Sequence, residues 1–208
     1  MLPGRFFIMR HGETVFNAAA RLQSNTMHTP LTTRGMTQAL RMGEALKAGL
    51  GLAPAMTLHV SDTGRALQTL GLVAETLHLD WFAARPTPLL REIDMGSWCG
   101  RDYSDVEAEV GPIVDADHLL QPAPDGEDYP AIAARLSRWL AEIEPGGDHL
   151  VVMHGISSRV LRGVMTGLAD HPRYHAPIAR GLRQGSIALI ADGVETLFHG
   201  ATQGGVLA

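Results

Sequence analysis

The stretch Phe6-Phe7-Ile8-Met9-Arg10-His11-Gly12-Glu13-Thr14-Val15-Phe16-Asn17 leads four apolar residues into an Arg-His-Gly turn and then into polar sequence. The apolar run predicts a strand buried on both faces, as in a parallel sheet. Ligands bind at the carboxyl ends of such strands, where Arg10, His11 and Gly12 would lie. The polar residues that follow predict a helix whose first backbone N–H groups face a bound anion. This junction therefore predicts one half of an anion-binding site.

Two later apolar runs end in residues of the same kind. The run 150–153 leads into His154-Gly155, and the run 56–60 leads into Ser61, with Arg65 about one helical turn further on. Because the carboxyl ends of parallel strands meet at one edge of a sheet, we expect these side chains to lie beside His11. Gly155 opens a helix whose N–H groups would also attract an anion.

The remaining sequence alternates between strand and helix patterns. The patterns predict strands over 6–9, 56–60, 150–153, 187–190 and 194–198, and helices over 32–49, 64–77, 102–110, 129–143 and 156–167. The last two strands form a hairpin around Asp192-Gly193, and Pro86 and Pro88 allow only a short or edge strand near them. We expect a single domain over 1–208. Its fold class is α/β, a three-layer α/β/α sandwich with a mostly parallel central sheet and an antiparallel edge.

The composition limits the classes of protein to consider. Hydrophobic residues make up 45% and charged residues 19% of the 208 residues, and no apolar run is long enough to span a bilayer. The first residues lack the pattern of a signal peptide, and the only cysteine, Cys99, cannot form an internal disulfide. We therefore expect a cytoplasmic protein with no membrane partner. The net charge of −5 argues against a nucleic-acid partner. A monomer and a homodimer both remain open.

The residues at the strand ends suit phosphoryl transfer. Neutral imidazole can attack phosphorus, and the ordinary pKa of histidine, about 6.5, makes that form available near neutral pH, so His11 is the candidate nucleophile. Arg10 and Arg65 would supply guanidinium groups for phosphate oxygens. Glu92, a carboxyl group in a stretch that also contains Leu89, Leu90 and Ile93, is a candidate proton donor, and Asp94 competes with it. Sequence does not rank these two carboxylates.

A catalytic zinc site is the alternative for two histidines and a glutamate. None of the usual local ligand spacings occurs in this chain, and two arginines would repel a divalent cation. We therefore expect no metal and no cofactor.

Taken together, these segments resemble the histidine phosphatase superfamily, the phosphoglycerate mutase-like proteins, over nearly the whole chain. The resemblance rests on the order and spacing of Arg10-His11-Gly12-Glu13-Thr14 with Asn17, Leu31-Thr32 with Gly35 and Gln38-Ala39, Ser61 with Arg65-Ala66 and Thr69, Glu92, Gly96 with Trp98 and Gly100, and His154-Gly155.

The resemblance implies a phosphoglycerate mutase-like fold and a role for each site residue. His11 would become phosphorylated, while Arg10, Arg65 and His154 hold the transferring phosphoryl group. Glu92 would protonate the leaving oxygen and then activate water. Asn17 would add a hydrogen bond to the phosphate. The backbone at Gln184-Gly185-Ser186 would lie close to the pocket.

Several positions depart from what is frequent in the family, and these concern the substrate. Ser24 stands where glycine is frequent, His28 where aspartate is frequent, and Cys99 where glutamate is frequent, while Asp62 and Thr63 replace a proline-leucine pair. The residues expected to line the substrate pocket are Gln23, Ser24, His28, Trp98, Cys99, Gln184 and Gly185.

The chain is short around 100–130, where glycolytic mutases of the family carry an insertion. We therefore expect a metal-independent phosphatase acting on a small soluble phosphate monoester. The alternatives are mutase-type transfer to a substrate hydroxyl and a module that binds phosphoesters without turnover. The sequence names no particular substrate.

Overall fold

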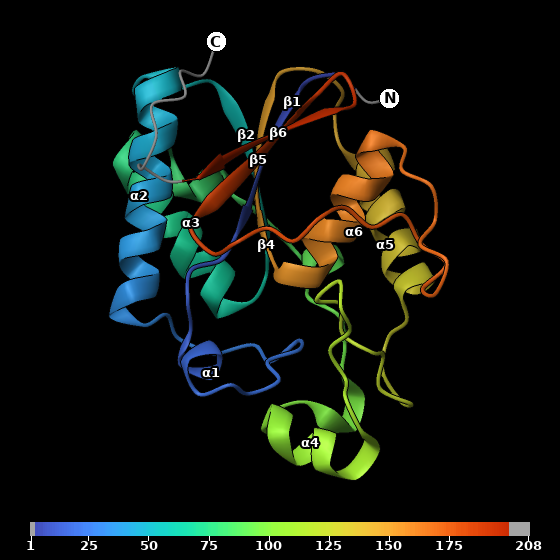
Figure 1. Ribbon diagram of the computed structural model, residues 1–208. Coiled ribbons are helices and arrows are strands. Elements are labelled where there is room, and N and C mark those ends of the chain that lie inside the picture. Colours follow the sequence, from blue (N-terminus) through green and yellow to red (C-terminus); the bar gives the residue numbers. More distant parts are fainter. Residues whose placement is uncertain (1–2, 200–208) are drawn as a thin grey trace.

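A six-stranded sheet forms the centre of the computed structural model, which describes residues 3–199 (Figure 1). Its strands are β1 (Arg5–Arg10), β2 (Met56–Ser61), β3 (Arg85–Thr87), β4 (Asp148–Met153), β5 (Ser186–Ala191) and β6 (Val194–His199). They lie in the order β3-β2-β4-β1-β5-β6. The first four of these are parallel, and β5 and β6 are antiparallel. The predicted sheet, with its terminal hairpin, is confirmed.

Helices cover both faces of this sheet. They are α1 (Val15–Ala18), α2 (Thr33–Leu50), α3 (Gly64–Leu77), α4 (Tyr103–Val110), α5 (Tyr129–Glu142) and α6 (Gly155–Thr166), with 3₁₀ turns η1 (Trp81–Ala83), η2 (Pro88–Leu90) and η3 (Gly96–Trp98). Figure 1 shows α2 and α3 on one side of the sheet and α5 and α6 on the other. The three-layer α/β/α arrangement is therefore confirmed. No helix in the described range 3–199 has both the length and the apolar character needed to cross a membrane.

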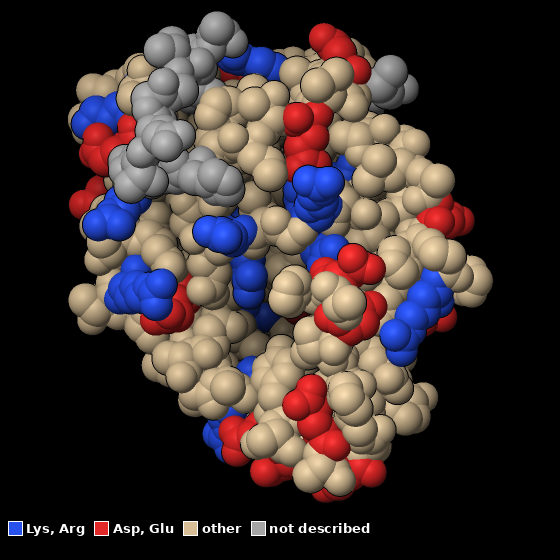
Figure 2. Space-filling view, viewed as in Figure 1, with Lys and Arg blue, Asp and Glu red and all other residues tan. Residues whose placement is uncertain are grey.

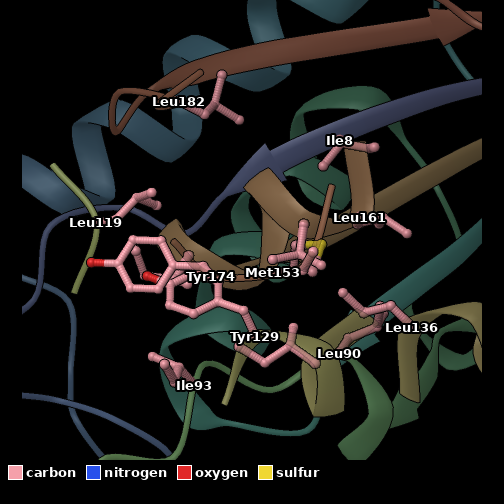
Figure 3. Close-up of a cluster of buried hydrophobic side chains, with 14 of the residues drawn as sticks. Ile8, Leu90, Ile93, Leu119, Tyr129, Leu136, Met153, Leu161, Tyr174 and Leu182 are labelled. Carbon is pink, nitrogen blue, oxygen red and sulfur yellow. The ribbon is translucent and has the colours of Figure 1, made fainter. Parts of the chain in front are cut away.

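The central strand β1 shows why its sequence reads as a continuous apolar run. Successive side chains of a strand point to opposite faces. Phe6 and Ile8 accordingly join the core beneath α5 and α6, whereas Phe7 and Met9 join the core beneath α2 and α3. Figure 3 shows Ile8 in the first of these cores, near Met153 of β4 and Leu161 of α6. Burial on both faces holds the end of β1 in a fixed position.

The helix expected after Gly12 is present as the short α1. α1 is a single turn, and its capping box uses its own residues: Asn17 N donates to Thr14 Oγ1 and Thr14 N donates to Asn17 Oδ1, both at 3.2 Å. Thr32 caps α2 through the backbone N–H of Gly35 (3.0 Å). The expectation that the first amides of a helix after Gly12 face an anion is therefore wrong.

The loop that contains Leu22, helix α4 and the segment 112–128 form a cap beyond the carboxyl ends of the parallel strands. This cap lies at the end of the molecule where Figure 1 shows α1 and α4. The chain near Leu22 pairs with the chain near Arg101, because Leu22 N donates to Arg101 O (2.8 Å) and Gly100 N donates to Leu22 O (2.7 Å). The segment 112–128 contains a bridge between Val114 and Leu120. The cap encloses the edge of the sheet where the candidate residues end.

Candidate active site

A cavity of about 230 Å³ opens between the carboxyl edge of the sheet and the cap. Figure 2 shows blue side chains around a hollow near the centre of one face of the molecule, and these are arginines because the only lysine, Lys47, lies in the last turn of α2. The cavity is lined by Arg10, His11, Asn17, Arg21, Leu22, Gln23, Ser24, Glu92, Ile93, Met95, Tyr103, Val114, His118, Leu120, Gly155, Ile156, Arg159, Gly181 and Leu182. Arg10, His11 and Glu92 therefore line this cavity, whereas Arg65 and His154 are fully buried and do not line it.

His11 directly follows β1, and one hydrogen bond defines its tautomer. Its Nδ1 lies 2.7 Å from the carbonyl oxygen of Gly12. Because a carbonyl oxygen only accepts, Nδ1 carries the hydrogen and Nε2 keeps its lone pair. Burial, followed by the charges of Arg65 and Arg10, holds the pKa of His11 well below its usual range. A neutral ring with a free Nε2 is the form that can act as a nucleophile.

Arg65 is fully buried behind His11, on the first turn of α3. Its Nη1 donates to Thr26 O (2.6 Å) and its Nη2 donates to Ser24 O (2.7 Å). Burial lowers the pKa of Arg65 to about 10, so the guanidinium remains charged at neutral pH. The loop 24–26 thus fixes a permanent cation next to His11.

His154 occupies the N-cap position of α6, and both of its ring nitrogens form hydrogen bonds to other side chains. Its Nδ1 accepts from Arg65 Nε (3.2 Å), so in the neutral ring Nε2 carries the hydrogen and donates to Ser61 Oγ (2.8 Å). The ring centroids of His154 and His11 are 5.1 Å apart. Burial, then the charge of Arg65 and the ring of His11, holds the pKa of His154 well below its usual range. The structure therefore brings His11, Arg65 and His154 together, as the strand ends predict.

The side chains of Arg10 and Glu92 both lie against Gly155. A Cβ at Gly155 would lie 3.3 Å from Arg10 Cζ and 3.4 Å from Glu92 Oε2, so only glycine leaves both groups undisturbed. Arg10 Nε is buried and has no hydrogen-bond partner among the described residues. Burial lowers the pKa of Arg10 and the Glu92 charge opposes that shift. A buried N–H without a partner is a donor for a ligand.

The Glu92 carboxylate occupies the N-terminus of α6. Ile156 N donates to Oε2 (3.0 Å) and Ser157 N donates to Oε1 (2.9 Å). The expectation that these α6 amides bind the anionic ligand is therefore wrong, because they hold a carboxylate of the protein itself. Asp94, the competing carboxylate, does not line the cavity, and its Oδ1 accepts from Gly96 N (2.9 Å). The structure thus favours Glu92 over Asp94.

Gly12 and Asn17 differ in how they face the cavity. The Gly12 N–H donates to Thr69 Oγ1 (3.1 Å), and a Cβ at Gly12 would come within 2.3 Å of Gly35 O. Gly12 is therefore required for packing against α2, and its N–H is not available to a phosphate, which corrects the expectation that Gly12 is a phosphate-binding residue. Asn17 lines the cavity, and its Oδ1 accepts from Gln184 Nε2 (2.7 Å). Its Nδ2 carries no hydrogen bond within 3–199 and remains able to donate to a ligand.

The residues expected around the substrate are only partly in the cavity. Gln23 and Ser24 line it, and Ser24 Oγ accepts from Met95 N (2.8 Å). The prediction is wrong for the other members of the set. His28 is exposed outside it, Trp98 is buried in the core, Cys99 Sγ contacts Thr26 Oγ1 at 3.2 Å, and Gln184 and Gly185 line a neighbouring groove with Arg34 and Arg41.

Other lining residues were not singled out from the sequence. They are Arg21, Leu22, Ile93, Met95, Tyr103, Val114, His118, Leu120, Ile156, Arg159, Gly181 and Leu182. The sequence could have indicated Arg159 as a lining residue, because Arg159 follows Gly155 by four residues on α6 and so lies on the same helical face. No group of three His, Cys, Asp or Glu side chains that could hold a metal ion occurs in the part of the chain that the structure describes.

Comparison with known proteins places this site in a family. The chain is 33% identical over 174 residues to the probable phosphoglycerate mutase GpmB of Citrobacter koseri, covering 78% of this chain and 74% of the relative. It superposes on the α-ribazole phosphatase of Shigella flexneri with a TM-score of 0.70 and 25% identity, covering 95% of this chain and 96% of the other. It also superposes on mycobacterial glucosyl-3-phosphoglycerate phosphatase with a TM-score of 0.70 and 27% identity, covering 89% of each chain. The model of the histidine phosphatase superfamily (branch 1) matches residues 6–181. The chain belongs to the histidine phosphatase superfamily.

Proposed function

We propose that the chain is a metal-independent phosphatase that hydrolyses a small soluble phosphate monoester through a phosphohistidine intermediate on His11. The observation that carries this proposal is the state of His11. Its Nδ1–H is committed to the Gly12 carbonyl, and its ring is neutral beside two arginines. A neutral imidazole placed among cations is suited to attack an electron-poor phosphorus whose oxygens those cations hold.

In the first step the lone pair of His11 Nε2 forms a bond to phosphorus while the ester P–O bond breaks. The electron pair of that bond stays on the leaving oxygen, which takes a proton from Glu92. Arg10 holds equatorial oxygens in this scheme, while Arg65 and His154, fully buried beside His11, support the site through charge and position. The free Arg10 Nε–H and the Asn17 amide supply further donors.

In the second step water attacks the phosphohistidine and Glu92 takes a proton from that water. The P–N bond breaks, its electron pair returns to His11 Nε2, and inorganic phosphate leaves. Glu92 suits both steps because it is the only Asp or Glu side chain among the described residues that line the cavity. The two α6 amides fix the direction in which its carboxyl group faces.

The test is the His11→Ala variant, with His78→Asn as its matched control. His78 is exposed at the far end of α3 in a left-handed conformation (φ 56°), which asparagine tolerates. We expect His11→Ala to lose release of p-nitrophenol from p-nitrophenyl phosphate and to form no acid-labile phosphohistidine. We expect His78→Asn to keep both, and a chelator to leave wild-type turnover unchanged. Substantial turnover by His11→Ala contradicts the proposed mechanism.

Mutase-type transfer is the second candidate, and the likeness to GpmB favours it. In that case phosphohistidine 11 returns its phosphoryl group to a substrate hydroxyl instead of to water. The structural likeness to two phosphatases supports hydrolysis. Phosphate release measured beside conversion of 3- to 2-phosphoglycerate separates the two reactions. Conversion faster than release would establish the mutase reaction.

A further inference from the structure

Tyr103 is held in the wall of the cavity by the cap. It is the first residue of α4, and its backbone N–H donates to Ala20 O (3.1 Å). The neighbouring Asp102 accepts from Arg21 Nε at 3.0 Å, which ties the same two loops together again. The Tyr103 side chain lines the same cavity as His11 and Glu92. Its position is therefore set by contacts that do not involve its own hydroxyl.

The Tyr103 hydroxyl has no hydrogen-bond partner among the described residues, unlike that of either other tyrosine. Tyr129 Oη donates to Leu120 O (2.9 Å), and Tyr174 Oη donates to Asp115 Oδ2 (2.8 Å). Burial and the Glu92 charge raise the pKa of Tyr103, so its hydroxyl remains protonated. Tyr103 is half-buried, and its hydroxyl is open to the cavity instead of sealed in the core, so a ligand that displaces water there can accept its hydrogen. An available donor in the cavity wall points to an acceptor on the ligand.

The side of the ligand that meets Tyr103 follows from the proposed function, on which this inference rests. The attacking and leaving atoms lie roughly in line through phosphorus. Because His11 attacks from the sheet edge, the leaving alcohol extends away from it, toward the cap that carries Tyr103. Val114 and Leu120, which also line the cap side, offer apolar side chains there. The Tyr103 hydroxyl is thus a hydrogen-bond donor on the leaving-group side.

We propose that Tyr103 donates a hydrogen bond to an oxygen atom of the leaving alcohol other than the ester oxygen. The enzyme would then favour phosphate esters of oxygen-rich alcohols, such as polyols and sugars, over esters of plain alkyl alcohols. Tyr103 is a specificity-determining residue in this scheme, while bond breaking rests on His11 and Glu92.

The experiment removes the Tyr103 hydroxyl and the free hydroxyls of the substrate, separately and together. We compare kcat/KM of the wild type and Tyr103→Phe for glycerol 1-phosphate and for n-propyl phosphate, which lacks the two free hydroxyls. We expect Tyr103→Phe to lower kcat/KM roughly three- to tenfold for the glycerol ester, the size of one neutral hydrogen bond, and to leave the propyl ester within twofold. Tyr129→Phe is the control, because its hydroxyl is bound to the protein and its loss would affect both esters equally.

Equal effects of Tyr103→Phe on the two esters, including no effect on either, would overturn the assignment of Tyr103. Phosphohistidine on His11 and wild-type turnover of p-nitrophenyl phosphate are measured in parallel. Their presence with equal effects overturns only the Tyr103 inference. Their absence overturns the proposed function and this inference with it.

Discussion

Gly155→Ala should separate activity from stability. Gly155 is the first residue of α6, and a Cβ there would lie 3.3 Å from Arg10 Cζ and 3.4 Å from both Arg10 Nε and Glu92 Oε2. These contacts are a few tenths of an ångström too close, so Arg10 and Glu92 must move apart. Small displacements of positioning groups are costly, and we expect kcat/KM to fall roughly 10- to 100-fold. Alanine is favoured over glycine in helices by up to about 1 kcal/mol, so stability should be kept or raised.

The matched control is Gly71→Ala in α3. A Cβ at Gly71 would meet only Trp81 Cζ3, at 3.8 Å, an ordinary contact far from the cavity. We expect this variant to gain about 0.5–1 kcal/mol in the free energy of unfolding and to keep wild-type activity. Urea unfolding and kcat/KM for p-nitrophenyl phosphate are measured for both variants. Full activity of Gly155→Ala would show that the spacing of Arg10 and Glu92 does not matter, and would refute this reasoning.

Two further predictions concern Glu92 and His59. In Glu92→Gln, p-nitrophenol leaves without needing a proton, so we expect one rapid burst of product. Attack by water still needs Glu92, so later turnover should be slowed at least 100-fold. Steady release at the wild-type rate would contradict the role of Glu92. His59 is buried against His149 (3.1 Å), and burial lowers its pKa from 6.5 to about 4. The unfolded chain therefore binds a proton first, and stability should fall by about 3 kcal/mol from pH 6.5 to 4. In urea unfolding His59→Gln should lose that part of the pH dependence, and an unchanged slope would rule it out.

The central part of the site could be predicted from the sequence because it depends on strand ends. Arg10-His11, Ser61 and His154 each end a strand whose apolar run is plain in the sequence, and parallel strands bring their carboxyl ends to one edge. Arg65 is the second residue of α3, the helix after β2, so the start of that helix places it near the same edge. Local sequence and topology alone therefore bring the basic side chains together.

The outer part of the site could not be predicted, because it depends on hydrogen bonds between distant irregular segments. Arg159 Nη1 donates to Asp117 O (2.9 Å) and His118 O (3.1 Å), which fixes the part of the cap that lines the cavity. Trp98 lies within a 3₁₀ turn that directs it into the core instead of the cavity. Loops without a period carry no signal for which side chain faces inward, so sequence order was a poor guide there.

The position of Glu92 explains why this site relies on side-chain cations. The amides of Ile156 and Ser157 at the start of α6 would suit a phosphate, but the Glu92 carboxylate occupies them. In the proposed mechanism the phosphoryl oxygens then need a guanidinium group, and the buried Arg10 Nε without a partner among the described residues is suited to that role. Two arginines, Arg10 and Arg65, stand against the single carboxyl group of Glu92. Burial and the charges of these arginines hold the pKa of His11 low, so its ring is neutral. If the proposed mechanism holds, one arrangement orients the acid, attracts the anion and keeps the nucleophile unprotonated.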